Sequence, residues 1–72
     1  MAPLRVNIAD PREAEVWCAE ERLAVAFLYD GRLHLRIEPR ADGRPWVVDA
    51  TGLGLAVDEA ARRIGADRIG AD

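Results

Sequence analysis

The most concentrated chemistry in the sequence is a run of basic residues, which consists of Arg32, His34, Arg36, Arg40 and Arg44. The first three alternate with apolar residues, so they should project from one face of a strand, and the last two fall in the adjoining loop. A guanidinium group matches the geometry of phosphate and carboxylate groups. The run is therefore a candidate binding patch for an acidic partner. The alternative is a solvated strand face whose arginine stems cover neighbouring alanines.

The charge balance weighs against nucleic acid as that partner. The chain of 72 residues has a formal net charge of −3, and its pI is near 5.0. Binding to a phosphate backbone depends on a strong positive field, and Glu38 and Asp42 interrupt the basic run. We therefore expect a protein partner, and a nucleic-acid-binding module remains the alternative.

The residue types that usually carry catalysis are nearly absent. The sequence has no Ser, Lys or Gln, and only one residue each of Cys, His, Tyr and Thr. Nucleophilic catalysis needs such a nucleophile beside an activating base, and one Cys with one His cannot form a zinc cluster. The sequence predicts no enzyme, no metal and no cofactor. An active site built from His34, Asp49 or Tyr29 would have to be shared across a dimer.

Three large aromatic side chains are candidate anchors for the core or for an interface: Trp17, Phe27 and Trp46. Tryptophan is enriched at interface hot spots, but a small domain has few other large side chains with which to fill its core. We expect both tryptophans in the core. Cys18, the single cysteine, is expected to be a small buried hydrophobe, and it excludes an intramolecular disulfide.

Residues 23–38 predict a β-hairpin, because apolar and polar residues alternate on both sides of an Asp-Gly pair. A two-residue turn would pair Leu28 with Leu33. A three-residue turn with a glycine bulge would pair Phe27 with Leu33 and gather the larger apolar residues of both strands on one face. We predict the bulged register, because one step of register exchanges the two faces and the larger apolar face should be buried.

Alternation of apolar and polar residues also predicts strands at residues 4–8 and 46–50. Residues 14–18 are rich in β-prone side chains and are expected to form a strand that turns directly into the hairpin. The Asp-Pro pair at positions 10–11 has the form of a helix start. A helix over residues 11–21 therefore remains the alternative for this segment.

Apolar residues at helical spacing predict a C-terminal helix from Leu53 to Ile64. Its acidic residues lie nearer its start and its arginines nearer its end, as the helix dipole favours. Gly65 is expected to cap this helix. Residues 65–72 are expected to form a frayed tail.

Together these elements predict a single α+β domain over residues 1–72, an antiparallel β-meander of four to five strands followed by one C-terminal helix packed on one face. A chain of 7.9 kDa buries about 60% of its surface on folding, which suffices for one core. Strands lie about 4.8 Å apart and a helix is about 10 Å wide, so one helix covers only two or three strands. We therefore expect a homodimer, or another protein partner in an accessory or regulatory role, to cover the remaining apolar face.

The sequence also bears on location and source. No apolar segment is long enough to span a membrane, and the first residues carry no apolar run typical of a signal peptide. We expect a cytoplasmic protein. Ten arginines without a lysine indicate a GC-rich coding genome, and hence a bacterial protein.

One stretch resembles a known family. The run from Asp42-Gly43 through Trp46-Val47-Val48 into residues 57–61 is similar to the strand-to-helix half of HicB-type antitoxins. The resemblance covers less than half of the chain, the glycine-threonine turn of the family is altered, and no strand follows the helix. It implies an antitoxin or immunity-type regulator as a second functional hypothesis, with the basic residues of the hairpin as its binding face.

Overall fold

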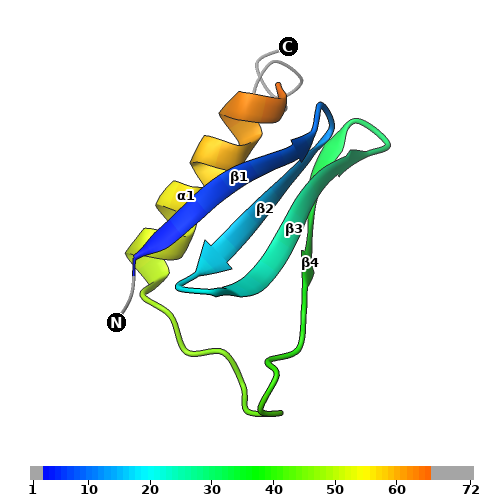
Figure 1. Cartoon of the computed structure of the whole chain (residues 1–72). Coiled ribbons are helices and arrows are strands. Elements are labelled where there is room, and N and C mark those ends of the chain that lie inside the picture. The colour runs from blue at the N-terminus through cyan, green and yellow to red at the C-terminus, as the bar shows by residue number, and fades with distance from the viewer. Residues whose placement is uncertain (1–2, 66–72) are drawn as a thin grey trace.

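The computed structural model describes residues 3–65 (Figure 1). A four-stranded antiparallel sheet with the order β1-β2-β3-β4 is followed by one helix, α1. The elements are β1 (Leu4–Asp10), β2 (Glu13–Cys18), β3 (Glu21–Tyr29), β4 (Arg32–Ile37) and α1 (Ala50–Ile64). The predicted α+β meander with a C-terminal helix is confirmed. Within the described residues, no helix has the length and apolar character needed to cross a membrane.

Residues 4–18 form a β-hairpin, so the alternative of a helix over residues 11–21 is wrong. The strand predicted at residues 14–18 lies within β2, which pairs with β1 on one side and with β3 on the other. The Asp10 carboxylate accepts a hydrogen bond from the Arg12 backbone N–H at 2.7 Å. The Asp-Pro pair thus stabilises a turn between two strands instead of a helix start.

The hairpin of β3 and β4 has a two-residue turn, and the predicted bulged register is wrong. Leu28 lies opposite Leu33, whereas Phe27 lies opposite His34. Asp30 and Gly31 have φ angles of 55° and 73°, the left-handed values that a type I′ turn requires at both central positions. This turn matches the twist of the two strands, so the Asp-Gly pair fixes the register locally.

The face that this register buries is rich in alanine. Ala14, Ala26 and Ala60 are each 0% exposed and form one core cluster with Ile64. Small side chains let a helix approach a sheet closely, so these alanines bury α1 against β2 and β3. The prediction failed because it ranked the two faces by side-chain size, whereas the close approach of α1 requires the smaller residues.

A β-bulge in β3 extends the buried face. Val16 pairs with Ala24, and Trp17 pairs with Arg22, so Leu23 is the extra residue. Leu23 is only 3% exposed and packs, like Ala24, in the second core cluster with Val16 and Ala56. The bulge therefore places two consecutive residues on the helix side of the sheet.

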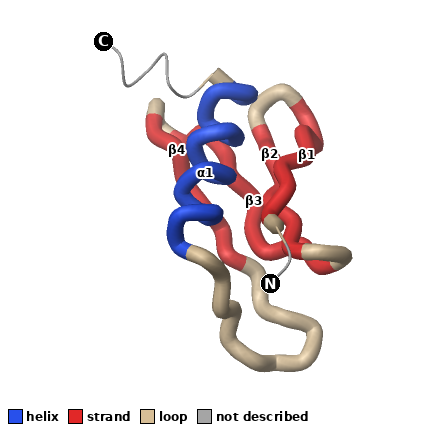
Figure 2. The backbone as a smooth tube through the Cα atoms, turned by 90° about the vertical axis from the view of Figure 1, so that its left-hand side faces the viewer, coloured by secondary structure: helices blue, strands red, loops and turns tan. Residues whose placement is uncertain are grey.

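The helix lies across one face of the sheet (Figure 2). It packs mainly on β1 and β2 and less on β3. The Asp49 carboxylate caps its start by accepting a hydrogen bond from the Gly52 N–H at 2.6 Å. Gly65 caps its end with a φ of 84°, as predicted. The rest of the predicted frayed tail, residues 66–72, lies outside the described residues.

Residues 38–49 form a long connection between β4 and α1, so the strand predicted at residues 46–50 is wrong. Trp46 and Val48 are half-buried against the second core cluster, and Val47 between them is 72% exposed. The alternation that suggested a strand is therefore present. The segment crosses the apolar face of the sheet, however, and has no strand beside it with which to form a ladder.

Candidate interaction surfaces

The outer edge of β4 is the first candidate surface. In a hairpin with a two-residue turn, the residues that flank the turn form a hydrogen-bonded pair, and such pairs alternate along the ladder. Even-numbered residues of β4 therefore bond to β3, which agrees with the bond of 2.9 Å from the Glu38 N–H to the Leu23 carbonyl oxygen. The backbone groups of the odd-numbered residues point outward. We define the outer edge of β4 as Leu33, Leu35 and Ile37.

The side chains of this edge belong to the apolar face, and α1 does not extend over all of them. Leu33 and Leu35 are half-buried against the core clusters, but Ile37 is 60% exposed. A pocket of about 160 Å³ opens beside them, and its lining is almost entirely apolar: Leu23, Ala24, Leu35, Ile37, Trp46, Val48 and Leu53. The outer edge of β4 thus combines backbone groups that have no partner among residues 3–65 with uncovered apolar side chains.

The opposite edge of the sheet is protected. The helix packs on β1, and the Arg63 guanidinium donates a hydrogen bond of 3.1 Å to the Val6 carbonyl oxygen. The same nitrogen lies 3.2 Å from the Glu59 carboxylate, which holds the arginine in place. A side chain that occupies an edge carbonyl removes a bonding position that another strand would need. The outer edge of β4 is therefore open to a further strand, whereas the β1 edge is partly blocked.

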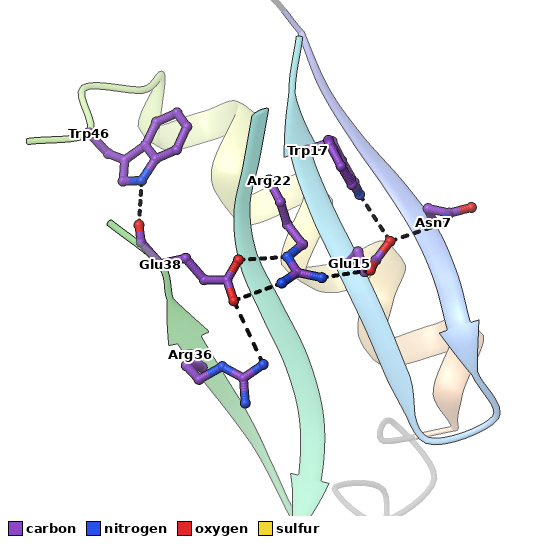
Figure 3. Close-up of polar contacts among 7 residues, drawn as sticks. All are labelled: Asn7, Glu15, Trp17, Arg22, Arg36, Glu38 and Trp46. Atoms are coloured by element: carbon purple, nitrogen blue, oxygen red, sulfur yellow. Dashed lines mark hydrogen bonds and ion pairs between the residues drawn. The ribbon is translucent and has the colours of Figure 1, made fainter. Parts of the chain in front are cut away.

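The sheet face opposite α1 carries a polar network centred on Arg22 (Figure 3). Its guanidinium binds Glu38 through two hydrogen bonds, of 2.6 and 3.0 Å, and binds Glu15 at 2.9 Å. Asn7 and Trp17 each donate a hydrogen bond of 3.1 Å to the Glu15 carboxylate. The network connects all four strands, from β1 to the residue that follows β4.

The network shifts the titration of its members. The pKa of Glu15 lies below its ordinary value of 4.5, chiefly because Trp17, Asn7 and Arg22 donate hydrogen bonds to the carboxylate. The pKa of Glu38 is also lowered, and there the hydrogen bonds from Arg22 are the largest cause. The same contacts with Glu38 and Glu15 raise the pKa of Arg22. All three groups are stabilised in their charged forms, which suits a structural role.

The structure brings together three of the five basic residues that the sequence singled out. Arg32, His34 and Arg36 are exposed on the face opposite α1. The His34 ring stacks on Phe27 with centroids 5.6 Å apart and meets Tyr29 edge-on at 5.5 Å. This face therefore presents basic and aromatic groups side by side.

The other two basic residues lie on the connection after β4. The Arg40 Nε atom is 3.9 Å from the Glu21 carboxylate and 3.7 Å from that of Asp42, and its guanidinium lies 5.0 Å from the centre of the Trp46 ring. Arg44 is exposed, and its backbone N–H binds the Asp42 carboxylate. Arg40 thus has acidic neighbours of its own, which leaves less of its charge for a partner.

The three aromatic anchors have different places. Trp46 is half-buried against the core, and its indole N–H donates a hydrogen bond of 2.7 Å to the Glu38 carbonyl oxygen. Trp17 and Phe27 are half-buried on the opposite face, and Arg5 covers the Trp17 ring at 5.3 Å. Cys18 is a free, half-buried thiol. Among residues 3–65, no three His, Cys, Asp or Glu side chains gather in a way that could hold a metal ion.

Sequence reasoning did not single out the Arg22 network or the difference between the sheet edges. Glu15 and Glu38 are distant from Arg22 in the sequence, and their contacts with it depend on the register of the strands and on the bulge at Leu23. The alternation of polar residues in β2 and β4 is the only feature of the sequence that points to this network.

Comparisons with protein-family models, curated proteins and solved structures found no match to this chain. The interpretation of these surfaces therefore depends on their own geometry.

Proposed function

We propose that this protein has no catalytic role and acts through protein–protein association, with a second copy of itself as the partner. The observation that carries the proposal is the outer edge of β4, where backbone groups without a partner in the described part of the chain lie together with the exposed Ile37 side chain, beyond the cover of α1. In an accessory or regulatory role, the resulting dimer would act by binding other molecules.

Burial of this edge gives a usable driving force. Complete burial of an isoleucine side chain contributes about 1.5–3 kcal/mol. Ile37 is 60% exposed, so covering it contributes about 1–2 kcal/mol per copy, on the order of 2–4 kcal/mol in a symmetric dimer. The outward N–H and C=O groups also gain partners when a second strand adds to the sheet. Because a twofold axis brings the same patch of both copies together, one such surface is sufficient for a closed dimer.

The experiment is a measurement of native mass by analytical ultracentrifugation over a range of protein concentrations. We expect a reversible dimer. Ile37→Arg should raise its dissociation constant about 30-fold to several hundred-fold, which corresponds to the loss of about 2–4 kcal/mol. Val47→Arg is the matched control, because Val47 is 72% exposed but lies on the connection outside the edge. A monomer at every concentration, or equal effects of the two variants, would contradict the proposal.

A second candidate function concerns the face opposite α1. The exposed group of Arg32, His34 and Arg36 beside Phe27 and Tyr29 supports an acidic partner or a single-stranded nucleic acid, since bases stack on aromatic rings and arginines bind phosphate. This candidate extends the antitoxin hypothesis. Titration with labelled single-stranded RNA at low salt tests it, with the double variant Arg32→Ala/Arg36→Ala as the comparison. Absence of binding by the unmodified protein would eliminate the nucleic-acid form of this function.

A further inference from the structure

The pairing geometry of β4 restricts how a second copy can be added. Three residues of the strand direct their N–H and C=O groups outward, and they are also the residues whose side chains lie on the apolar face: Leu33, Leu35 and Ile37. An antiparallel strand from a second copy can satisfy all six backbone groups only if these odd-numbered residues face one another. Registers are therefore allowed only in steps of two residues.

We infer that two copies pair through antiparallel β4 strands with Leu35 facing its own counterpart on a twofold axis, an inference that rests on the function proposed above. In this register Leu33 of each copy lies opposite Ile37 of the other, and the three facing pairs form six hydrogen bonds. The sheet becomes an eight-stranded sheet with both helices on the same face. The apolar side chains of the two β4 strands then form one continuous surface.

The charges on the opposite face favour this register. It places Arg32 of each copy opposite Glu38 of the other, and the symmetry makes two such pairs. Arg32 has no ion pair among the described residues, whereas Glu38 already binds Arg22 and accepts the approach of further guanidinium groups, as the Arg36 contact at 3.8 Å shows. The register also places His34 opposite Arg36, a pairing that adds no attraction.

The neighbouring registers are less favourable. A shift by two residues that moves Arg36 onto the twofold axis places Arg36 opposite Arg36 and Leu33 opposite Pro39, which has no N–H to donate. A shift by two residues in the other direction, which moves His34 onto the axis, places Arg32 of each copy opposite Arg36 of the other. Like charges directly opposite one another destabilise a pair of strands. Of these three registers, only the one centred on Leu35 keeps all three hydrogen-bonded pairs and places no arginine opposite another arginine.

The β1 edge does not compete for the second copy. Arg63 occupies the Val6 carbonyl oxygen there, and α1 packs along the same strand. The usual protections of an open edge strand include prolines and charged side chains. The outer edge of β4 consists of two leucines and an isoleucine, and the charged residues of the strand, Arg32 and Arg36, lie on the face opposite α1, where the inferred register pairs Arg32 with Glu38. The two edges therefore predict a closed dimer and not an extended fibre.

Disulfide trapping tests the register. Leu35→Cys in a Cys18→Ala background should form a disulfide-linked dimer in a mild redox buffer, because Cα atoms of a hydrogen-bonded pair lie about 5.5 Å apart, within the range of a disulfide. The matched control is Leu33→Cys in the same background. Its two copies would be offset by four residues, about 13 Å along the strands, which is too far for a disulfide. A mixture of Leu33→Cys and Ile37→Cys should crosslink as a heterodimer.

Amide hydrogen exchange of the unmodified protein provides an independent measurement. Exchange at Leu33, Leu35 and Ile37 should slow as protein concentration rises, while exchange at Arg36, whose N–H already bonds to β3, should change little. A dimer by mass in which Leu33→Cys crosslinks as fast as Leu35→Cys, or in which exchange at these three amides does not depend on concentration, would overturn the inferred register and leave the proposed function standing. A monomer at all concentrations would overturn both.

Discussion

Substitution of Ala60 by leucine tests the packing that determines the fold. Ala60 is 0% exposed in the second half of α1, and it lies in one cluster with Ala14 and Ala26, which are also completely buried. A leucine here adds an isopropyl group where the side chains of two strands leave no space. Either the leucine adopts a strained rotamer or α1 moves away from β2, and both outcomes weaken the fold.

The expected size of the effect follows from this contact. Extra methylene groups forced into a packed core cost about 1–3 kcal/mol. For a domain of this length, 1 kcal/mol corresponds to a shift in Tm of about 4–8 °C. We therefore expect Ala60→Leu to lower the free energy of unfolding by about 1–3 kcal/mol and the Tm by about 4–24 °C. The control is Ala50→Leu, which makes the same change at an exposed position in the first turn of the same helix.

Urea unfolding, followed by tryptophan fluorescence and by circular dichroism at one protein concentration, measures both variants. Ala50→Leu should stay within about 0.5 kcal/mol of the unmodified protein, as surface substitutions usually do. If Ala60→Leu also stayed within that range, the alanine face would not be the contact surface of α1. The register with Leu28 opposite Leu33, which directs Ala26 toward α1, would then lose its physical explanation.

Two further predictions concern charged groups. Hydrogen bonds from Trp17, Asn7 and Arg22 lower the pKa of Glu15, and hydrogen bonds from Arg22 lower the pKa of Glu38, so these carboxylates stabilise the fold fully above about pH 4.5, their ordinary value, and this contribution is lost as the pH falls through their lowered pKa values. The urea concentration at the unfolding midpoint, measured from pH 7 to pH 2, should therefore decrease once the pH is below 4.5. Arg22→Met should reduce that decrease, and an unchanged acid profile in the variant would contradict the assignment. Arg32→Glu should weaken self-association because the new carboxylate would face the Glu38 carboxylate of the second copy, whereas Arg44→Glu, the same change on the exposed connection, should not. Sedimentation at low and high salt measures both variants, and equal effects would exclude a specific role for Arg32.

Much of the fold could be predicted from local signals. The strands at residues 4–8 and 14–18, a turn at the Asp-Gly pair and the glycine cap at Gly65 depend only on near neighbours in the sequence, and each lies where it was expected, although the turn has two residues and not the predicted three. The register of the hairpin could not be ranked correctly, because the choice between faces depended on how closely α1 approaches the alanines. That approach is a tertiary property, and side-chain size along one strand does not report it.

The candidate surfaces divide in the same way. The alternation in β4 was sufficient to place Arg32, His34 and Arg36 on one face, and the structure brings them together there. The alternation of residues 46–50 was also recognised, but it belongs to a connection that crosses the sheet. An apolar and polar pattern states which side chains are buried, and it does not state whether a neighbouring strand is present. For that reason the unpaired edge became apparent only with the complete topology.

The extra residue in β3 has a consequence for how this chain tolerates change in length. Without Leu23, the strand would follow regular alternation, and Arg22 would still point away from α1 while the sheet lost one large apolar contact and some of its local twist. One residue could therefore be deleted at the bulge without changing which side chains of β3 face α1. A deletion at most other positions of β3 would reverse the two faces for the rest of the strand, so length variation in this strand should be concentrated at this single site.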